Sequence, residues 1–403
     1  MKILHLADLH LRDADIEEAT RCGEFIVAKA DEECPKLITI AGDIFDSQDI
    51  KLDTKAARLA IQFVSDLARI APVVIVRGTP SHDGNSPEIL SLAFGIGRVY
   101  VATKPTQLYL YDDNCLATVE EIDPVITDDV EAVITLVPTP TKQFFQGSEG
   151  TDIKTGDAEI AGAMATMFAG FGAMAAKYKV PHILIGHWNI TGAYVSATQI
   201  LTGVDIEISP DQMALAHADL CCMGHIHKPQ PIGQNIFYSG SPWALNWGEE
   251  YRHGFFLHTL CDHSLLNSQF ILTPATGLLR YNLDMTAGQK AAELIAPTGG
   301  PENAIVRIDI NVFQDEVDLI DRPYLQDAFS WAKKVDIRIN RIPRGNVRSE
   351  TILIAERLRD KLTAKANMNG GGMVPESILR KADAIEGMEP EALVSAVGKG
   401  GAL

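Results

Sequence analysis

This sequence contains few cysteines and no long apolar run. Its six cysteines form no Cys-x-x-Cys pair, so neither a zinc knot of that spacing nor a disulfide framework is indicated, and we expect reduced thiols that are mostly buried. No stretch reaches the roughly 18 apolar residues of a membrane span. Lys2, His5 and Asp8 interrupt the start before the apolar core of a signal peptide could form. We therefore expect a cytoplasmic protein that does not associate with membranes.

Basic residues are also scarce. The chain has 35 Lys and Arg against 53 Asp and Glu, a formal net charge of −18. Proteins that bind nucleic acid normally place Lys and Arg on the phosphates, so this balance argues against DNA binding by charge alone. Two routes to DNA stay open: bound divalent cations reverse the potential locally, or a partner subunit carries most of the binding.

The length of 403 residues exceeds one ordinary domain, since a domain usually has ~100–200 residues. In the first two thirds, short apolar runs alternate with helical patterns. The expected strands are 3–6, 37–41, 73–76, 132–137, 182–185 and 220–223, and the expected helices are 15–33, 54–70 and 158–179. Continuous apolar runs of this length suit strands that are buried on both faces and covered by helices.

The pattern changes near residue 255, where strands become frequent. A strand–helix–strand segment follows, with its helix over 322–333, and suggests a small α+β cap. Another helical pattern covers 349–366, and Gly370 to Gly372 give a flexible break. We predict a first domain over 1–272, an α+β capping domain over 273–345 and a helical tail over 346–403.

Five short motifs carry Asp or His at the end of an apolar run, often beside glycine. They are Asp8-Leu9-His10, Gly42-Asp43 within AGDIFD, Ser81-His82-Asp83, Gly186-His187 and Gly224-His225-Ile226-His227. In open α/β sheets the ends of such strands are where ligands bind. One such motif is common by chance, but the ordered set indicates a metal site.

The spacing of these residues suits metal ligation. Asp8 and His10 are two apart, so both side chains leave one face of an extended segment, and the same holds for His225 and His227. Mixed nitrogen and oxygen ligands suit Mn²⁺, Fe or Zn²⁺. Asp43 is the natural bridging carboxylate between two ions, which at ~3.5–4 Å apart can activate water and neutralise a phosphoryl transition state.

Other conspicuous side chains have ordinary explanations. Trp243 and Trp247 follow the last motif and would either stack on a frayed DNA end or pack against the core, and packing is the simpler expectation. The remaining histidines are expected to be structural or solvated: His5, His182, His217, His253, His258 and His263.

The series DLH, GDIFD, SHD, GH and GHIH resembles the calcineurin-like metallophosphoesterase superfamily. The run YSGSPWALNWGEEYRHGFFL that follows resembles the SbcD family of DNA repair exonucleases more closely. The resemblance implies an α/β fold, a two-sheet metallophosphoesterase sandwich flanked by helices, over about residues 2–257. The cap and tail match only in layout.

The resemblance also implies roles for residues. Asp8, His10, Asp43 and His227 would hold one ion, and Asp43, His187 and His225 the second. Both would be divalent, with Mn²⁺ expected. His82 would lie beside the scissile phosphate and assist the leaving oxygen. Asp83 would fix the His82 ring, or would simply be a turn residue before Gly84.

The chain departs from the family at one ligand. Relatives usually have Gly-Asn-His-Asp, whose Asn binds the second metal, whereas this chain has Gly-Thr-Pro-Ser-His-Asp over 78–83. Counting back from His82 places Ser81 at the Asn position, and Thr79 is the alternative if the loop bulges. Either hydroxyl would be a shorter and weaker ligand than the amide.

The resemblance implies a Mn²⁺-dependent 3′→5′ exonuclease and structure-specific endonuclease for double-strand DNA ends and hairpins. It would work with a coiled-coil ATPase of the SbcC type in double-strand-break repair. One alternative is a phosphodiesterase or nucleotidase for small substrates, which would share the metal site. Another is a non-catalytic scaffold for the ATPase, against which the retained ligand set argues.

Two surfaces are expected to bind partners. Family members form homodimers near the His82 motif, where the segment 87–95 is rich in apolar residues and offers either a two-fold contact or simple packing under the helix 54–70. In the tail, Ile354, Leu358 and Leu362 form one apolar stripe. That helix would bind either the ATPase coiled coil or its own cap.

Overall fold

The computed structural model describes residues 1–93, 98–118, 129–141, 157–199, 206–249, 251–290, 299–300, 304–344, 357–368 and 374–386. The chain forms two compact units. The first comprises Met1–Tyr281, Ala296–Ile308 and Phe329–Asp336, and the second comprises Asn282–Ile295, Asp309–Ala328 and Ile337–Leu403. The boundaries expected from sequence, at 272 and 345, remain predictions.

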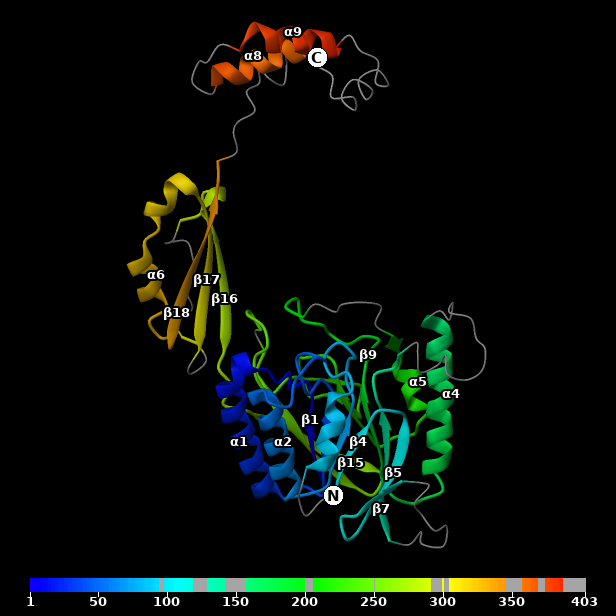
Figure 1. The fold of residues 1–403 in the computed structure, drawn as a ribbon. Coiled ribbons are helices and arrows are strands. Elements are labelled where there is room, and N and C mark those ends of the chain that lie inside the picture. Colours follow the sequence, from blue (N-terminus) through cyan, green and yellow to red (C-terminus); the bar gives the residue numbers. More distant parts are fainter. Residues whose placement is uncertain are drawn as a thin grey trace. The chain divides into compact units, whose positions relative to one another are not determined.

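The first unit is built on two sheets (Figure 1). One has six strands in the order β15 (Ser264–Leu272), β14 (Gly254–Cys261), β1 (Lys2–Leu6), β2 (Leu37–Ala41), β3 (Val73–Val76) and β4 (Val99–Ala102). Strands β1 to β4 run parallel, and β14 runs antiparallel to β1. The carboxyl ends of β1, β2 and β3 therefore meet at one edge.

The other sheet has seven strands in the order β12 (Gln230–Ile232), β13 (Ile236–Tyr238), β11 (Leu220–Gly224), β8 (His182–His187), β7 (Val130–Val137), β5 (Thr106–Tyr111) and β6 (Leu116–Thr118). Its central strands β13, β11, β8 and β7 are parallel. A separate pair joins β9 (Asn189–Ile190) to β10 (Glu207–Ile208).

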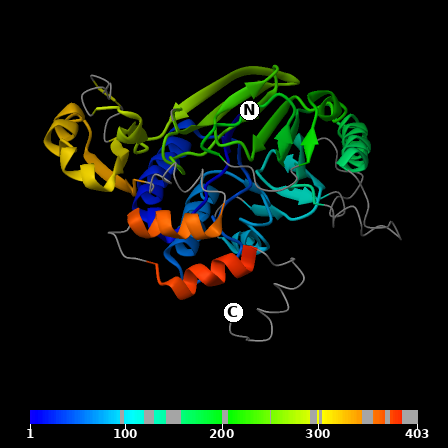
Figure 2. The ribbon, with the colours of Figure 1, turned by 90° about the horizontal axis from the view of Figure 1, so that it is seen from above.

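Helices cover the outer faces of both sheets, as the two views in Figures 1 and 2 show. Helices α1 (Ile16–Glu33) and α2 (Lys55–Ala68) pack on the six-stranded sheet, and α4 (Asp157–Ala175) and α5 (Pro210–Ala214) on the seven-stranded one. A separate apolar layer fills the space between the sheets. The first unit is thus the expected two-sheet α/β sandwich flanked by helices.

Local sequence signals define where these helices begin and end. The Thr54 side chain accepts a hydrogen bond from the Ala57 amide (3.2 Å) and caps α2. Ser209 and Gln212 form a capping box at the start of α5. The helix expected over 158–179 ends at Ala175. Pro181 sets only an outer limit, because the residue before a proline disfavours helical geometry.

The remaining described elements are smaller. A three-stranded sheet has the order β16 (Leu278–Asp284), β17 (Ile305–Phe313) and β18 (Lys334–Ile342), and α6 (Arg322–Ala328) lies between the last two in sequence. Alternate residues of β17 are buried, as expected of a strand with one covered face. Short 3-10 helices are η1 (Asp13–Asp15), η2 (Ser86–Leu92), η4 (Met285–Ala287) and η6 (Gln314–Leu319).

The tail contains two helices that contact each other, α8 (Leu358–Met368) and α9 (Glu376–Glu386). Arg359 of α8 donates to Glu376 of α9 at 3.1 Å. Of the expected helix over 349–366, residues 349–356, including Ile354, lie outside the described part of the chain. Among the helices that the structure describes, none has the length and apolarity to cross a membrane.

Candidate metal centre

The residues of the five motifs gather where parallel strands end. Asp8 and His10 follow β1, Asp43 follows β2, and residues 79–83 follow β3. From the other sheet, His187 ends β8, and His225 and His227 follow β11. The two sheets thus contribute to one cluster at their carboxyl edges, where α/β folds bind ligands.

Several of these residues have left-handed backbone geometry. The φ angles are 52° at Asp8, 42° at His10, 49° at Asp43 and 95° at His225. Such geometry is costly for non-glycine residues and is found where the surroundings enforce it. Here the His10 amide donates to the Asp43 carbonyl at 3.0 Å, so the first two loops hold each other's backbone in place.

Two glycines allow the strand ends to approach closely. A Cβ on Gly42 would lie 2.4 Å from Nδ1 of His187, and Gly42 itself has a φ of +83°. A Cβ on Gly224 would lie 1.9 Å from the carbonyl oxygen of Ala41. No other residue fits at either position without displacing backbone or a candidate ligand.

A first ligand set consists of Asp8, His10 and His227. Their ligand atoms lie within 4.8 Å of one another, and all three residues are buried. Nε2 of His10 and Nδ1 of His227 have no hydrogen-bond partner among the described residues. Buried polar atoms are normally paired, so two unpaired nitrogens beside a buried carboxylate fit a cation.

A second ligand set consists of Asp8, Asp43 and His187. Nδ1 of His187 lies 2.7 Å from the Ala41 carbonyl and donates to it, which leaves Nε2 facing Oδ2 of Asp43 at 3.2 Å. The His225 ring is adjacent, 5.2 Å from that of His187. Oδ2 of Asp43 is also 3.7 Å from Nε2 of His10. Asp43 therefore lies between the two sets, where a bridging ligand would be.

Thr79 contacts this cluster, and Ser81 is exposed. The Thr79 amide donates to Oδ1 of Asp43 at 2.6 Å, and its Oγ1 lies 3.2 Å from both Oδ2 of Asp43 and Nε2 of His187. The Ser81 side chain is exposed, and its carbonyl accepts from the Gln48 amide. Of the two hydroxyls considered from sequence, that of Thr79 is at the metal centre.

His82 lies at the edge of the cluster. Its ring is 4.6 Å from that of His10, and its Nδ1 is 3.1 Å from the carbonyl of Asp46. The Asp46 carboxylate is 3.7 Å from Nδ1 of His10. Asp46 thus contacts both histidines, and its position as the last residue of AGDIFD was the only sign of this in the sequence.

Asp83 is fully buried and binds backbone. Its Oδ1 accepts from the amides of Ile44 (2.8 Å) and Phe45 (3.1 Å), and its Oδ2 accepts from the amide of Gly78 (2.7 Å). It therefore fastens the loop after β3 to the loop after β2. The sequence left open whether Asp83 fixes the His82 ring or is a turn residue before Gly84; in the structure, the His82 ring contacts the Asp46 carbonyl and the His10 ring.

Gln199 is a contributor that the sequence did not indicate. Its Nε2 donates to the His225 carbonyl at 2.6 Å, and its Oε1 accepts from the His227 amide at 3.0 Å. One side chain thereby holds the backbone on both sides of Ile226. A single glutamine distant in sequence from its partners has no motif, so only the fold reveals it.

The buried charges perturb one another. Burial raises the pKa of Asp8 to about 7, and the Asp43 charge adds to this effect. Burial would raise the pKa of Asp43 as well, but His187 holds it below its ordinary value. Burial lowers and Asp43 raises the pKa of His187, to about 9 on balance. Clustered buried carboxylates with imidazoles suit divalent cations, which offset the charge.

The other histidines are placed as the sequence indicated, within the core or in solvent. His5, His182, His253 and His258 are buried, and His217 and His263 are exposed. Trp243 is buried in the core, and the guanidinium of Arg307 lies 3.7 Å from the centroid of the Trp247 ring.

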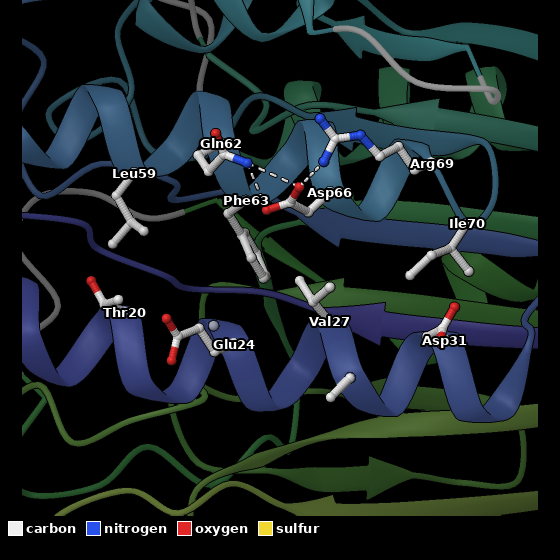
Figure 3. A pocket seen from close by; sticks show the side chains of 12 residues that line it. Thr20, Glu24, Val27, Asp31, Leu59, Gln62, Phe63, Asp66, Arg69 and Ile70 are labelled. Atoms are coloured by element: carbon white, nitrogen blue, oxygen red, sulfur yellow. Dashed lines mark hydrogen bonds and ion pairs between the residues drawn. The ribbon is translucent and has the colours of Figure 1, made fainter.

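A groove of about 530 Å³ runs between α1 and α2 (Figure 3). The Phe63 and Val27 side chains line it, and Gln62 and Arg69 both bond to Asp66 at its edge. None of its lining residues is a candidate ligand, so the groove is separate from the metal centre.

Comparison with known proteins agrees with this site. Residues 1–229 match the sequence model of the calcineurin-like phosphoesterases. The chain is 25% identical over 280 residues to the SbcD component of the SbcCD nuclease of Staphylococcus epidermidis, covering 67% of this chain and 69% of that protein.

Two solved structures are similar in part. One is the anchor in the inner membrane complex of Plasmodium, with a TM-score of 0.40, 13% identity and coverage of 69% of this chain and 90% of that one. The other is a dimetal phosphatase from Danio rerio, with a TM-score of 0.40, 10% identity and coverage of 68% and 99%.

Proposed function

We propose that this chain, which belongs to the calcineurin-like phosphoesterase family, is a DNA nuclease of a double-strand-break repair complex. Family membership makes it a metal-dependent phosphoesterase, because the match covers more than half of the chain. The proposed activity is 3′→5′ exonuclease and structure-specific endonuclease cleavage of double-strand ends and hairpins. We place it in the cytoplasm, with Mn²⁺ as the ion.

One observation carries the catalytic part of the proposal. The two buried ligand sets share Asp8, and Oδ2 of Asp43 lies 3.7 Å from Nε2 of His10 in one set and 3.2 Å from Nε2 of His187 in the other. Asp8, His10, Asp43 and His227 would hold one ion, and Asp43, His187 and His225 the other, with Thr79 as the hydroxyl ligand in preference to Ser81. When bound, such a pair activates water and neutralises charge on the phosphoryl group.

His82 would act on the substrate. Its ring lies beside that of His10, and its Nδ1 contacts the Asp46 carbonyl. Nε2 is the nitrogen that this contact leaves for the substrate. A histidine here can donate a hydrogen bond or a proton to the leaving oxygen. Asp83 would position this loop through its three amide contacts.

The choice of DNA rests on the resemblance to a component of the SbcCD nuclease. It is supported by the second unit and tail, which a dedicated small-molecule enzyme needs less. A phosphodiesterase or nucleotidase for small substrates would use the same ions and is the alternative. A non-catalytic scaffold is disfavoured, since every Asp and His of the expected ligand set is present and buried.

The proposed protein partner is a coiled-coil ATPase of the SbcC type, bound through the tail. Leu358 and Leu362 are half-buried on α8, and the α8–α9 pair is held by Arg359 with Glu376 and Asp383. A helical pair with an apolar stripe suits binding to another helix. A protein ending at Pro343 should keep its metals but fail to retain the ATPase in a pull-down, and undiminished retention would reject the tail as the contact.

A second copy of this chain is the proposed partner of the surface around η2. Leu52 and Leu92 are 62% and 67% exposed, and both line an open hollow of about 410 Å³ with Ile89. Leu90 of the same segment is fully buried and anchors η2. Exposed leucines beside a hollow suit a two-fold contact, in which the leucines of each copy pack into the hollow of the other copy.

The activity is tested with end-labelled duplex DNA, Mn²⁺ and the partner ATPase. Nucleotides released from 3′ ends, and loss of cleavage on chelation, would support the proposal. A cyclic nucleotide and a nucleoside monophosphate are assayed in parallel. Efficient turnover of either, with DNA left intact, would favour the small-substrate alternative.

A further inference from the structure

A second group of metal-ligating side chains lies outside the candidate metal centre. It consists of His5 on β1, Cys222 on β11 and His258 on β14, all fully buried, with ligand atoms within 4.8 Å of one another. Two of its strands belong to the six-stranded sheet and one to the seven-stranded sheet. None of the three residues is used by the proposed phosphoesterase chemistry.

The three side chains enter the apolar layer between the sheets. Their strand neighbours at positions two apart, Ile3, Leu220 and Phe256 among them, belong to that layer, and alternate residues of a strand share a face. The cluster is therefore a group of polar side chains surrounded by apolar ones. Burying polar groups is costly unless they are satisfied by partners or by an ion.

The hydrogen bonds fix which nitrogen of His5 is available. Nε2 of His5 lies 3.2 Å from the Met223 carbonyl, which only accepts, so that nitrogen carries the proton. Nδ1 then presents its lone pair to Nε2 of His258, at 3.3 Å. Nδ1 of His258 in turn lies 2.8 Å from the Ser268 hydroxyl, which can accept a hydrogen bond from it.

The separation of the two facing nitrogens suits one shared ion. Two imidazole nitrogens each ~2.0 Å from a metal, at an angle between tetrahedral and trigonal, lie ~3.3–3.5 Å apart. The observed distance is 3.3 Å. The Cys222 sulfur supplies the third, soft ligand. With its Nδ1 proton directed at the Ser268 hydroxyl, His258 presents the lone pair of Nε2 to the position it shares with His5.

We propose that His5, Cys222 and His258 form a buried three-coordinate site for a monovalent soft metal ion, Cu⁺. Thiolate ligands select Cu⁺, and trigonal His₂Cys sites are a known copper geometry. Structural Zn²⁺ sites almost always have four protein ligands, whereas this cluster provides three.

Charge also favours a monovalent ion. Binding replaces the Cys222 thiol proton with the metal: the S–H bond breaks, an S–Cu bond forms, and one proton leaves to solvent. One thiolate and one Cu⁺ make a neutral unit. A divalent ion with the same ligands would leave a net positive charge in an apolar layer, which is costly.

Bound copper would join the two sheets. It would connect β1 and β14 of one sheet to β11 of the other, beside the hydrogen bonds that already link His5 to the Met223 carbonyl (3.2 Å) and to the Ser239 hydroxyl (3.0 Å). An ion that binds only the folded state stabilises it by mass action, so the site would raise thermal stability without altering hydrolysis directly.

Adjacent cysteines on β11 offer a matched test. Cys221 and Cys222 are both buried, but Cys221 packs in the layer beneath α4 and Cys222 in the layer between the sheets. The full-length protein is expressed with copper supplementation, kept reduced under anaerobic conditions and dialysed against a Cu⁺ chelator. Copper content and X-ray absorption are then measured for wild type, Cys222→Ser and Cys221→Ser.

We expect one retained copper per chain in wild type and Cys221→Ser, with one sulfur and two nitrogen neighbours. Cys222→Ser should lose that equivalent, and the copper-dependent rise in melting temperature should disappear with it. The candidate phosphoesterase ligands include no sulfur, so a sulfur neighbour distinguishes the two sites. If Cys222→Ser does not fold, His258→Gln, which leaves the thiol in place, should show the same loss.

Three results would overturn the proposal. Absence of retained copper would mean that His258 donates Nε2–H to His5 in an ion-free network. Equal copper in both cysteine variants would place the ion elsewhere. Retention of Zn²⁺ at the cluster in preference to Cu⁺, with Cys222 as its ligand, would show that the assigned ion is wrong.

Discussion

Thr79 and Asp43 are joined by two hydrogen bonds, from the Thr79 amide to Oδ1 (2.6 Å) and from its hydroxyl to Oδ2 (3.2 Å). The first bond orients the carboxylate, and the second places an oxygen beside the proposed bridging ligand and beside His187. The loop after β3 therefore reaches the candidate metal centre through the Thr79 hydroxyl, where the family resemblance leads one to expect an Asn side chain.

Thr79→Val should weaken binding of one ion by roughly 10–100-fold, the usual effect of losing a group that orients or supplements metal ligands. Valine keeps the shape and removes only the hydroxyl. Ser81→Ala is the matched control and should bind both ions normally, because Ser81 is exposed. Calorimetric titration measures the Mn²⁺ affinity of both variants. Weaker binding by Ser81→Ala, with normal binding by Thr79→Val, would assign the ligand role to Ser81.

Asp43→Asn should remove tight binding of both ions and reduce phosphodiesterase activity to background. The reason is that Asp43 contacts His10 of one ligand set and His187 of the other. Metal analysis after dialysis and hydrolysis of a chromogenic phosphodiester provide the measurement. Asp31→Asn, an exposed change on α1, is the control. Wild-type turnover by Asp43→Asn would exclude the two-metal arrangement.

His82→Ala should leave metal content nearly intact while slowing the chemical step by ~10²–10⁴-fold, if the histidine is a general acid. We expect this because Nδ1 of His82 contacts the Asp46 carbonyl at 3.1 Å. This contact holds the His82 ring at the edge of the cluster and outside the proposed ligand sets. Single-turnover cleavage at saturating Mn²⁺ separates the two effects. A variant that lost an ion yet kept its rate would make His82 a ligand.

Protonation of His182 should destabilise the fold in acid. Gln107 donates to Thr135 Oγ1 (2.9 Å), and the Thr135 hydroxyl lies 2.7 Å from Nε2 of His182, to which it can donate a hydrogen bond. Burial lowers the pKa of His182 to about 4.

Preferential proton binding by the unfolded state lowers the stability of the fold in acid. Because the folded pKa lies below the unfolded value of ~6.5, the unfolded state binds the proton first. The contribution of His182 is complete above about pH 6.5 and declines between pH 6.5 and 4 by up to ~1.4 kcal/mol per pH unit. In His182→Gln, urea unfolding should depend less steeply on pH over this range. Identical slopes would contradict the lowered pKa of His182 in the folded protein.

Leu92→Glu should shift the protein from dimer to monomer in sedimentation at micromolar concentration, because a charge would be buried in the proposed contact. Leu215→Glu is the control, since Leu215 is also exposed (41%) but follows α5. A wild-type protein that sediments only as monomer would exclude the dimer.

Much of the fold was predictable from sequence because its strands are continuous apolar runs. The pattern placed a strand at 37–41 and another at 73–76, and β2 and β3 have those bounds. The pairing of β1 with β14, in which His5 lies opposite Phe256, could not be predicted, since nothing in the local sequence specifies a partner about 250 residues away.

The clustering of the Asp and His residues of the candidate metal centre was predictable from their positions at strand ends, but the course of the loops was not. The amides of His82 and Asp83 both donate to the Thr79 carbonyl, at 3.0 and 2.9 Å. This turn directs Ser81 outward and brings Thr79 inward. Counting along the sequence treats the segment as extended and therefore selected Ser81. The contacts of Asp46 and Asp83 escaped prediction for the same reason.

The candidate ligands come from two sheets that share no backbone hydrogen-bond ladder in the described residues. Asp8, His10 and Asp43 follow strands of one sheet, whereas His187 ends a strand of the other and His227 follows one. The distance between the halves of the centre is consequently set by how the sheets pack, and Gly224 lies so close to the Ala41 carbonyl that a side chain there would collide with it. Small sliding of one sheet across the other would separate the candidate ligands without any change in their own conformation, so the affinity of the centre for metal would report on the rigidity of the apolar layer directly beneath it.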